Sequence, residues 1–206
     1  MSDYTARRDN GAEAIAGDSV SFHGAPAVST SQLTVMALLA TAGMLFAGFA
    51  SAYLVRRAGT DWAPLPLPSV LIFSTVILAI SSATMEASRW YLRRQLSAAA
   101  FLWAATTTLL GLAFLAGQLD AWRQLSAQGV YLPSGPHSSF FYVLTAAHGL
   151  HLAGGIVFLA YLLWRLPRRQ QDRRDSRIQD TLRSCATYWH FVGGVWLLLY
   201  LLLTLY

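Results

Sequence analysis

Five long apolar stretches dominate the chain, and polar or charged residues gather between them. The stretches cover about residues 33–55, 68–85, 96–119, 138–164 and 184–206. A helix needs roughly 20 apolar residues to cross a bilayer core of about 30 Å, and each stretch is long enough or nearly so. Because lipid offers no partner to a free backbone amide or carbonyl, each stretch is predicted to be an α-helix. The apolar residues are continuous rather than alternating, which argues against the strands of a membrane β-barrel.

The pattern therefore predicts an all-α membrane protein built as a bundle of five transmembrane helices. We expect these helices at about 33–56, 68–92, 96–120, 138–165 and 184–206. Residues 1–32 are small and polar, and they are expected to form a mostly disordered tail. Residues 33–206 are then one five-helix transmembrane domain.

Composition supports a membrane protein over a soluble one. Hydrophobic residues make up 55% of the 206 residues and charged residues 12%, and the mean hydropathy is +0.42. Soluble domains carry about 25% charged residues, and a soluble fold this apolar would expose large sticky patches. Cys185 is alone, which excludes a disulfide framework and a cysteine-based metal site.

The net charge is +5, from fifteen basic and ten acidic residues, and every basic residue is Arg. The positions of the Arg residues therefore show whether this charge indicates membrane orientation or a nucleic acid partner. If five helices cross in turn, twelve of the fifteen lie on one side of the membrane, and only Arg56, Arg57 and Arg123 lie on the other. Positive charge prefers the cytoplasmic side, which predicts a cytoplasmic N-terminus and a C-terminus outside, in the periplasm. Because the Arg residues follow the topology and no nucleic-acid-reading motif is present, nucleic acid is not expected as a partner.

Ionisable side chains inside the apolar stretches are costly, so each is a candidate for function. Glu86 and Arg89 stand one helical turn apart and are predicted to form an ion pair, with proton handling by Glu86 as the alternative. His148 and His151 share one helix face, and His190 stands near the start of the last helix. For these histidines, spacing alone allows both polar packing between helices and ligation of a metal or haem.

Two segments carry a resemblance to a known family. The run FFYVLTAAHGLHLAGG at 140–155 resembles the signature of subunit III of haem–copper respiratory oxidases, and CATYWHFVGGVW at 185–196 is similar to that family's YWHFVDxVW segment. Further agreement comes from FAGFASAY at 46–53, LPLPSVLIFST at 65–75 and LGLAFLAGQ at 110–118. The resemblance spans about residues 33–206, and the length is that of the short five-helix bacterial form.

The chain departs from the family pattern at three positions that are commonly acidic. The Glu of the first matching helix is Ala42 here, and the Asp of the YWHFVDxVW segment is Gly193. The acid before the Trp that follows the third helix is Ala121, with Asp120 one step earlier. Any role of the family acids in holding protons or tuning pumping is therefore not carried over to this chain.

The resemblance implies a non-catalytic subunit without its own active site, metal or cofactor, with haem and copper in the partner subunits I and II. It implies a place in the bacterial cytoplasmic (inner) membrane, in a complex that passes electrons to oxygen and contributes to proton translocation. There the chain would stabilise subunit I and bind structural phospholipids. Membership of a respiratory supercomplex is left open.

On this resemblance, lipid-binding or structural roles are expected for His148, His151, Tyr188, Trp189, His190, Glu86, Arg89, Arg93 and Arg94. Trp and His at helix ends can hydrogen-bond lipid headgroups, and Arg attracts anionic lipid. Phe46, Gly48 and Phe49 are expected to contact subunit I, because small and aromatic residues allow close packing.

Two other functions stay open on the sequence. One is a membrane cytochrome b that ligates haem through His148 or His151 together with His190. The other is an accessory subunit of a nitric oxide reductase-type complex, whose accessory proteins share this pattern. The electron donor, cytochrome c or quinol, reacts with other subunits, so the sequence of this chain does not identify it.

Overall fold

The computed structural model describes residues 30–62, 65–165 and 176–205. These residues form the helices α1 Thr30–Arg57, α2 Val70–Arg93, α3 Ser97–Ala127, η1 Leu132–Ser134, α4 Pro136–Arg165 and α5 Ser176–Leu205. Among the described residues, the five α-helices are each long and apolar enough to cross a membrane, which confirms the predicted all-helical class. The predicted disordered tail lies, up to residue 29, outside the described residues.

Two helices extend beyond the apolar stretches that predicted them. α3 continues from the expected end at 120 to Ala127, where Gly129 takes a φ of 78° and its N–H bonds to the carbonyl of Ser126. α5 begins at Ser176 rather than at 184, and this added part of the helix buries Leu182. In both places the added part of the helix carries charged residues, so the apolar stretch is shorter than the helix.

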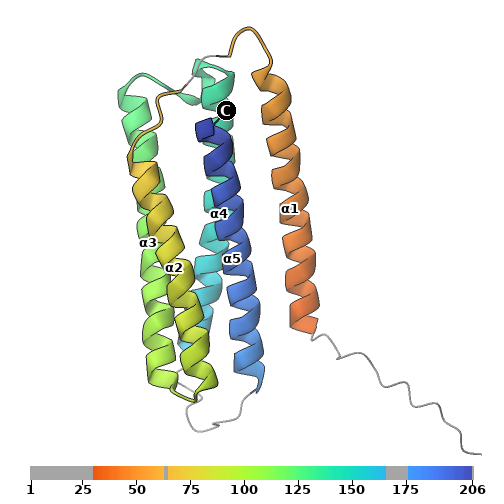
Figure 1. Cartoon of the computed structure of the whole chain (residues 1–206), viewed down its shortest axis with the longest axis vertical. Helices are drawn as coiled ribbons and strands as arrows, with labels where there is room; N and C mark the ends of the chain where they lie inside the picture. Colours follow the sequence, from red (N-terminus) through yellow and green to blue (C-terminus); the bar gives the residue numbers. More distant parts are fainter. Residues whose placement is uncertain (1–29, 63–64, 166–175, 206) are drawn as a thin grey trace, which may run out of the picture.

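Consecutive helices run antiparallel, so the bundle has two ends of different composition (Figure 1). The end where α1 and α5 begin, here named the Arg-rich end, carries Arg89, Arg93, Arg94, Arg165 and Arg183. The opposite end, here named the Pro-rich end, carries Arg56, Arg57 and Arg123. The grouping of Arg residues predicted from the sequence therefore holds for those that the structure describes.

A short turn at 94–96 joins α2 to α3 and sets them antiparallel. Gln95 takes a φ of 63°, a left-handed conformation that is uncommon for residues other than glycine. The N–H of Leu96 bonds back to the carbonyl of Tyr91 at 3.0 Å, which satisfies a backbone group that the end of α2 leaves free. The turn thus brings α3 back directly alongside α2.

Small and hydroxyl-bearing residues hold α2 against α3. The hydroxyl oxygens of Thr84 and Thr107 lie 2.8 Å apart, and Ser88 Oγ donates to the carbonyl of Ala100 at 2.8 Å. A Cβ added at Gly117 would collide with a serine hydroxyl of α2. Close backbone approach and interhelical hydrogen bonds drive helix association in lipid, where burial of apolar side chains gains little.

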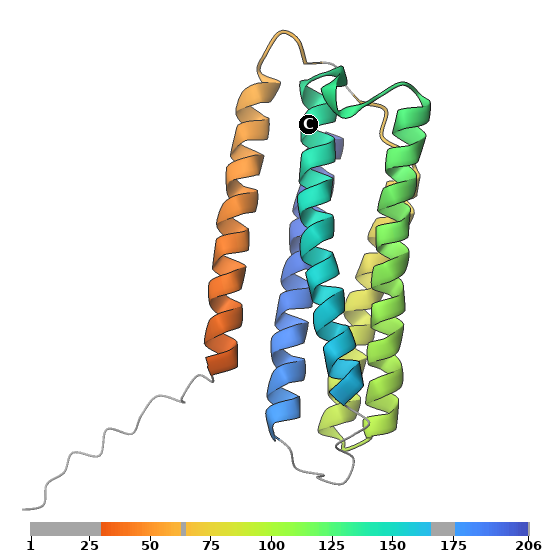
Figure 2. The same cartoon turned by 180° about the vertical axis from the view of Figure 1, so that it is seen from behind.

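α1 lies at the edge of the bundle, beside α4 and α5 and away from α2 and α3 (Figures 1 and 2). On the side of α1 that faces the bundle, Gly43 lies against the ring of Phe191, and the ring of Phe46 lies 5.3 Å from that of His151. Most of its large apolar side chains are exposed, Met44 by 76%. Much of α1 is thus left for lipid or another protein to cover.

The core lies between α4 and α5 on one side and α2 and α3 on the other. Its largest fully buried side chains are aromatic, among them Trp189, Trp196, Phe114 and Phe141. Large apolar side chains on the outer surface of every α-helix are exposed. A protein surrounded by water rarely exposes this much apolar surface, so the structure is that of a multi-pass membrane protein.

Candidate functional site

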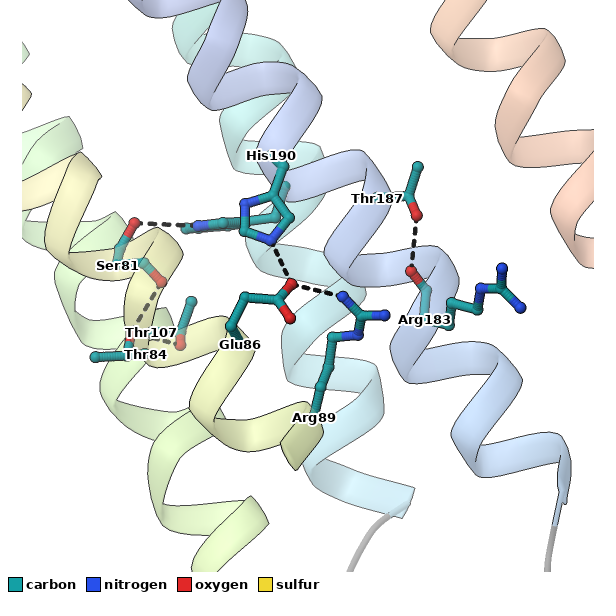
Figure 3. A network of polar contacts seen from close by, with 9 residues as sticks. Ser81, Thr84, Glu86, Arg89, Thr107, Arg183, Thr187 and His190 are labelled. Atoms are coloured by element: carbon teal, nitrogen blue, oxygen red, sulfur yellow. Dashed lines mark hydrogen bonds and ion pairs between the residues drawn. The ribbon is translucent and has the colours of Figure 1, made fainter. Parts of the chain in front are cut away.

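A network of charged side chains joins α2 to α5 near the Arg-rich end (Figure 3). Glu86 Oε1 lies 2.6 Å from Arg89 Nη1, which confirms the ion pair expected from their spacing. The same oxygen lies 2.7 Å from His190 Nε2, a contact across the helix interface that the sequence did not predict. The Glu86 side chain is 50% exposed, so the network sits at the rim of the bundle and not in its core.

The two remaining arginines of the predicted lipid set take different positions. Arg94 lies with its guanidinium 3.9 Å above the centre of the Trp90 ring, a cation–π contact. Arg93 is exposed and lines a small hollow between α2 and α5 with Arg89 and Arg183. The structure thus brings Arg89 and Arg93 to one place and keeps Arg94 out of it.

His148 lies in the centre of the bundle and is fully buried. Its ring is surrounded by aromatic rings, with centroids 5.1 Å away for Trp196, 5.7 Å for Phe114 and 6.4 Å for Phe46. Neither ring nitrogen has a hydrogen-bond partner among the described residues. The hydrogen-bonded interhelical packing expected for this histidine is therefore absent, and aromatic packing takes its place.

His151 and Tyr188 connect α4 to α5 one turn closer to the Arg-rich end. His151 Nδ1 lies 2.7 Å from the carbonyl of Ala147 in its own helix. The hydroxyl of Tyr188 donates to the backbone carbonyl of His151 at 2.8 Å. The contact between the two helices thus runs through the backbone of His151 and leaves its imidazole half-buried against Phe46.

Trp189 anchors α5 to α2 from within the core. The indole is almost completely buried, and its Nε1–H donates to Ser81 Oγ at 3.1 Å. Gly111 of α3 makes room for this ring, because an added Cβ would lie 2.6 Å from Trp189 Cη2. Tyr188 and Trp189 are therefore packing residues between helices.

The three residues expected at a partner interface face different ways. Phe46 is buried within the chain against His148 and His151 of α4. Gly48 is exposed, with nothing within 4 Å of an added Cβ, and Phe49 is half-buried. A partner can reach α1 directly at Gly48 and Phe49.

An aromatic junction at the Pro-rich end was missed by the sequence reasoning. The N–H of Leu65 donates to His137 Nδ1 at 3.1 Å, so Nε2 carries the ring proton and donates to the hydroxyl oxygen of Tyr53 at 3.4 Å. The Trp62 ring stacks on the His137 ring at 4.7 Å. The junction ties the end of α1, the following loop and the start of α4. The nearness of aromatic and Pro residues in these segments was the only available signal.

The three positions that lack the family acids lie in packed surroundings. Ala42 and Ala121 are buried, and a Cβ at Gly193 would lie 3.7 Å from Ser82 Oγ. Asp120 is exposed and accepts a hydrogen bond from Gln124 at 2.8 Å, so it does not restore a buried acid at 121. This chain therefore avoids the desolvation cost of buried carboxylates at these positions.

Cofactor ligation requires side chains that converge on one point. Within 30–62, 65–165 and 176–205, no group of three or more His, Cys, Asp or Glu side chains could hold a metal ion. His190 is engaged by Glu86, and the His148 ring is enclosed by aromatic residues. The geometry of these histidines supports helix packing and a hydrogen bond between α2 and α5.

The sequence of this chain is similar to those of known proteins over most of its length. The sequence profile of the family Cytochrome c oxidase subunit III matches residues 19–206. The chain is 31% identical over 197 residues to cytochrome c oxidase subunit 3 of Synechocystis sp., covering 92% of this chain and 80% of that protein. It is 32% identical over 162 residues to a probable cytochrome c oxidase subunit 3 of Mycobacterium tuberculosis (76% and 78% covered), and 32% identical over 134 residues to a probable quinol oxidase subunit 3 of Staphylococcus aureus (65% of each). With its five apolar helices and both signature segments in place, the chain belongs to the cytochrome c oxidase subunit III family.

Proposed function

We propose that this chain is a non-catalytic accessory subunit of an aerobic terminal oxidase and stabilises its oxygen-reducing subunit I. The match of residues 19–206 to the subunit III family carries the proposal. Haem and copper are then held by subunits I and II, where electrons pass to oxygen and protons are translocated. The contribution of this chain is a membrane-embedded surface and not a redox group.

The surface proposed for subunit I is the outward face of α1. This helix contacts α4 and α5 only, among the elements that the structure describes, and leaves large apolar side chains exposed. Gly48 leaves room on α1, since a Cβ added there would meet nothing within 4 Å, and it lines an open hollow with Phe140 of α4. A helix of another subunit can approach closely at such a place, which is how helices pack in lipid.

The orientation proposed for the chain places the Arg-rich end in the cytoplasm of a bacterium, with the C-terminus in the periplasm. Five of the described Arg residues lie at that end and three at the other. The positive-inside rule favours this orientation. Alkaline phosphatase fused after residue 206 should then be active, and an inactive fusion would contradict the orientation.

The role proposed for each signature residue depends on whether its side chain is buried or exposed. His148, Tyr188 and Trp189 are buried within the chain and act as packing residues between helices, and His151 joins them through its backbone. Lipid headgroups are proposed instead for the rim of the Arg-rich end. There Glu86, Arg89, Arg93, Arg94 and His190 are at least partly exposed.

Purification of the tagged chain from its own membranes tests the proposed function. We expect it to co-purify with a haem–copper subunit I, and we expect Gly48→Leu to lower the yield of that complex. Ala113→Leu, which places the same side chain at an exposed site of α3, is the control. Recovery of a complex with a nitric oxide reductase catalytic subunit would favour that alternative, and recovery without any haem–copper subunit would contradict the proposal.

A further inference from the structure

The two ring nitrogens of His137 make hydrogen bonds of different kinds at the Pro-rich end. Nδ1 accepts the backbone N–H of Leu65 at 3.1 Å, and Nε2 lies 3.4 Å from the hydroxyl of Tyr53. Because a backbone N–H can only donate, Nδ1 must be unprotonated in this arrangement. His137 is buried and Leu65 is half-buried, so water has little access to the bond between them.

A proton on Nδ1 would remove the acceptor that holds Leu65. An imidazolium has two N–H donors and no lone pair on either nitrogen. The N–H of Leu65 and the new N–H of the ring would then point at each other. Because a half-buried amide without an acceptor is unfavourable, the segment that carries Leu65 is expected to move away from the ring.

The contacts of His137 with Tyr53 and Trp62 do not depend on that lone pair. Nε2 carries a proton in both states of the ring, so it can donate to the Tyr53 hydroxyl oxygen in both. The Trp62 ring stacks on the imidazole with centroids 4.7 Å apart and planes at 17°. A cation is favoured over the face of an indole. Protonation therefore releases Leu65 selectively and leaves Tyr53 and Trp62 attached to α4.

His137 and Leu65 both line a hollow of about 500 Å³ at the Pro-rich end. Arg57 of α1, Leu67 of the segment before α2 and Thr204 of α5 line it as well. The hollow brings a proton from the aqueous side to a ring that is otherwise buried. Displacement of Leu65 would widen it.

The imidazole is the group at this junction that responds to pH between 5 and 8, the range in which histidine ordinarily titrates. On α1 the titratable or charged groups that face it are Tyr53 and Arg57. Tyr ordinarily titrates near pH 10, and Arg stays charged. The described lining of the hollow from α5 and from the segment before α2 consists of Leu and Thr side chains. Asp61, next to Trp62, pairs with Arg56 and has a pKa below 3.8.

We propose that the hydrogen bond between Leu65 and His137 is a pH-sensitive switch, which breaks when acid at the Pro-rich end protonates Nδ1. Breaking it frees the segment from Leu65 to the start of α2, while Tyr53 and Trp62 stay on α4. In the orientation proposed above, the Pro-rich end faces the outside, where proton translocation delivers protons. The switch then responds to acid that the complex itself releases, and this last step rests on the proposed function.

Hydrogen exchange at the amide of Leu65 tests the switch in the full-length chain in lipid nanodiscs. Residues 65–68 read LPLP, so Leu65 and Leu67 carry the only amide hydrogens there, and mass spectrometry can assign them. Rates are corrected for the intrinsic pH dependence of exchange. We expect protection of Leu65 to be about 10-fold lower at pH 5 than at pH 7.5, the effect of losing one hydrogen bond.

Variants at position 137 separate the proton from the packing. His137→Asn offers an amide oxygen as acceptor and takes up no proton in this range, so protection of Leu65 should persist at both pH values. His137→Ala removes the acceptor, and protection should be low at both. His151→Asn is the matched control, the same change at a half-buried histidine of α4 outside the junction, and it should keep the pH response of the unaltered chain.

Three results would overturn the inference. They are equal protection of Leu65 at pH 5 and pH 7.5 in the unaltered chain, an unchanged pH response in His137→Asn, and loss of the response in His151→Asn. If His137→Ala does not fold, the comparison of the unaltered chain with His137→Asn still decides. Because the assay uses the chain alone, a failure to co-purify with subunit I would contradict the proposed function without changing this result.

Discussion

Glu86 and His190 stand 104 positions apart in the chain and meet across the α2–α5 interface, with Oε1 and Nε2 2.7 Å apart. The same carboxylate oxygen is 2.6 Å from Arg89, one turn along α2. One acid thus joins a neighbour in its own helix to a residue of the last helix. All three side chains are partly exposed, which limits what their attraction contributes to stability.

Removing the charge of Glu86 should therefore have a small but measurable effect. We expect Glu86→Gln to lower the free energy of unfolding by about 1 kcal/mol or less, and His190→Asn to do the same. Denaturant unfolding of the full chain in mixed micelles measures both. The double variant should lose little more than either single variant, and fully additive losses would contradict a direct interaction. Asp120→Asn, at an exposed acid that bonds within α3, is the control.

Gly111 allows α3 to pass close to the ring of Trp189. An added Cβ would lie 2.6 Å from Trp189 Cη2, and the buried indole has little room to move. We expect Gly111→Ala to cost about 1–3 kcal/mol of unfolding free energy, the range for an overpacked core. Gly194→Ala is the matched control, since nothing lies within 4 Å of its added Cβ. Equal stability of the two variants would show that the ring is not held in place.

His148 is a polar ring enclosed by apolar rings. Because neither of its nitrogens has a hydrogen-bond partner among the described residues, burying them costs free energy that an aliphatic side chain would not. We expect His148→Leu to leave the unfolding free energy of the isolated chain unchanged or to raise it by about 1 kcal/mol. Trp196→Leu, which also loses the bond from Nε1 to Thr75 Oγ1 at 2.9 Å, should be clearly less stable. A large loss in His148→Leu would indicate that the ring is bonded after all.

Asp61 lies outside the helices, at the Pro-rich end, and pairs with Arg56. The hydrogen bond from the Arg56 guanidinium holds the pKa of this carboxyl below its ordinary value of 3.8. The carboxylate therefore contributes stability at neutral pH, and the contribution disappears as the pH falls below 3.8 through the lowered pKa. Thermal unfolding should show a small difference between the unaltered chain and Asp61→Asn at pH 6 that vanishes at low pH. In an Arg56→Gln background the difference should be absent at both pH values.

Hydrophobic continuity and the positions of Arg were enough to predict the five helices and the charge difference between the two ends. Both are properties of single segments, which a sequence displays directly. The early start of α5 at Ser176 and the late end of α3 at Ala127 were not predicted, because there the helix continues into charged sequence. In such regions hydropathy marks the membrane span and not the helix.

The candidate site was only partly predictable for a related reason. The pairing of Glu86 with Arg89 depends on helical spacing, and it was found from the sequence. The contacts of Glu86 with His190 and of Tyr53 with His137 join segments 104 and 84 residues apart, and one sequence does not show which helices are neighbours. The aromatic surroundings of His148 are likewise a product of four helices meeting.

The position of α1 means that the helices pack in a different order from the one in which they are synthesised. α2 and α3 can pair as soon as α3, which follows directly after the turn at 94–96, has been synthesised. Among the described α-helices α1 is made before the other four, yet its contacts are with α4 and α5, which are made after α2 and α3. α1 therefore stays in the membrane without these contacts until α4 and α5 have been made. During that interval its apolar surface is open to an assembly factor or to a subunit already in place.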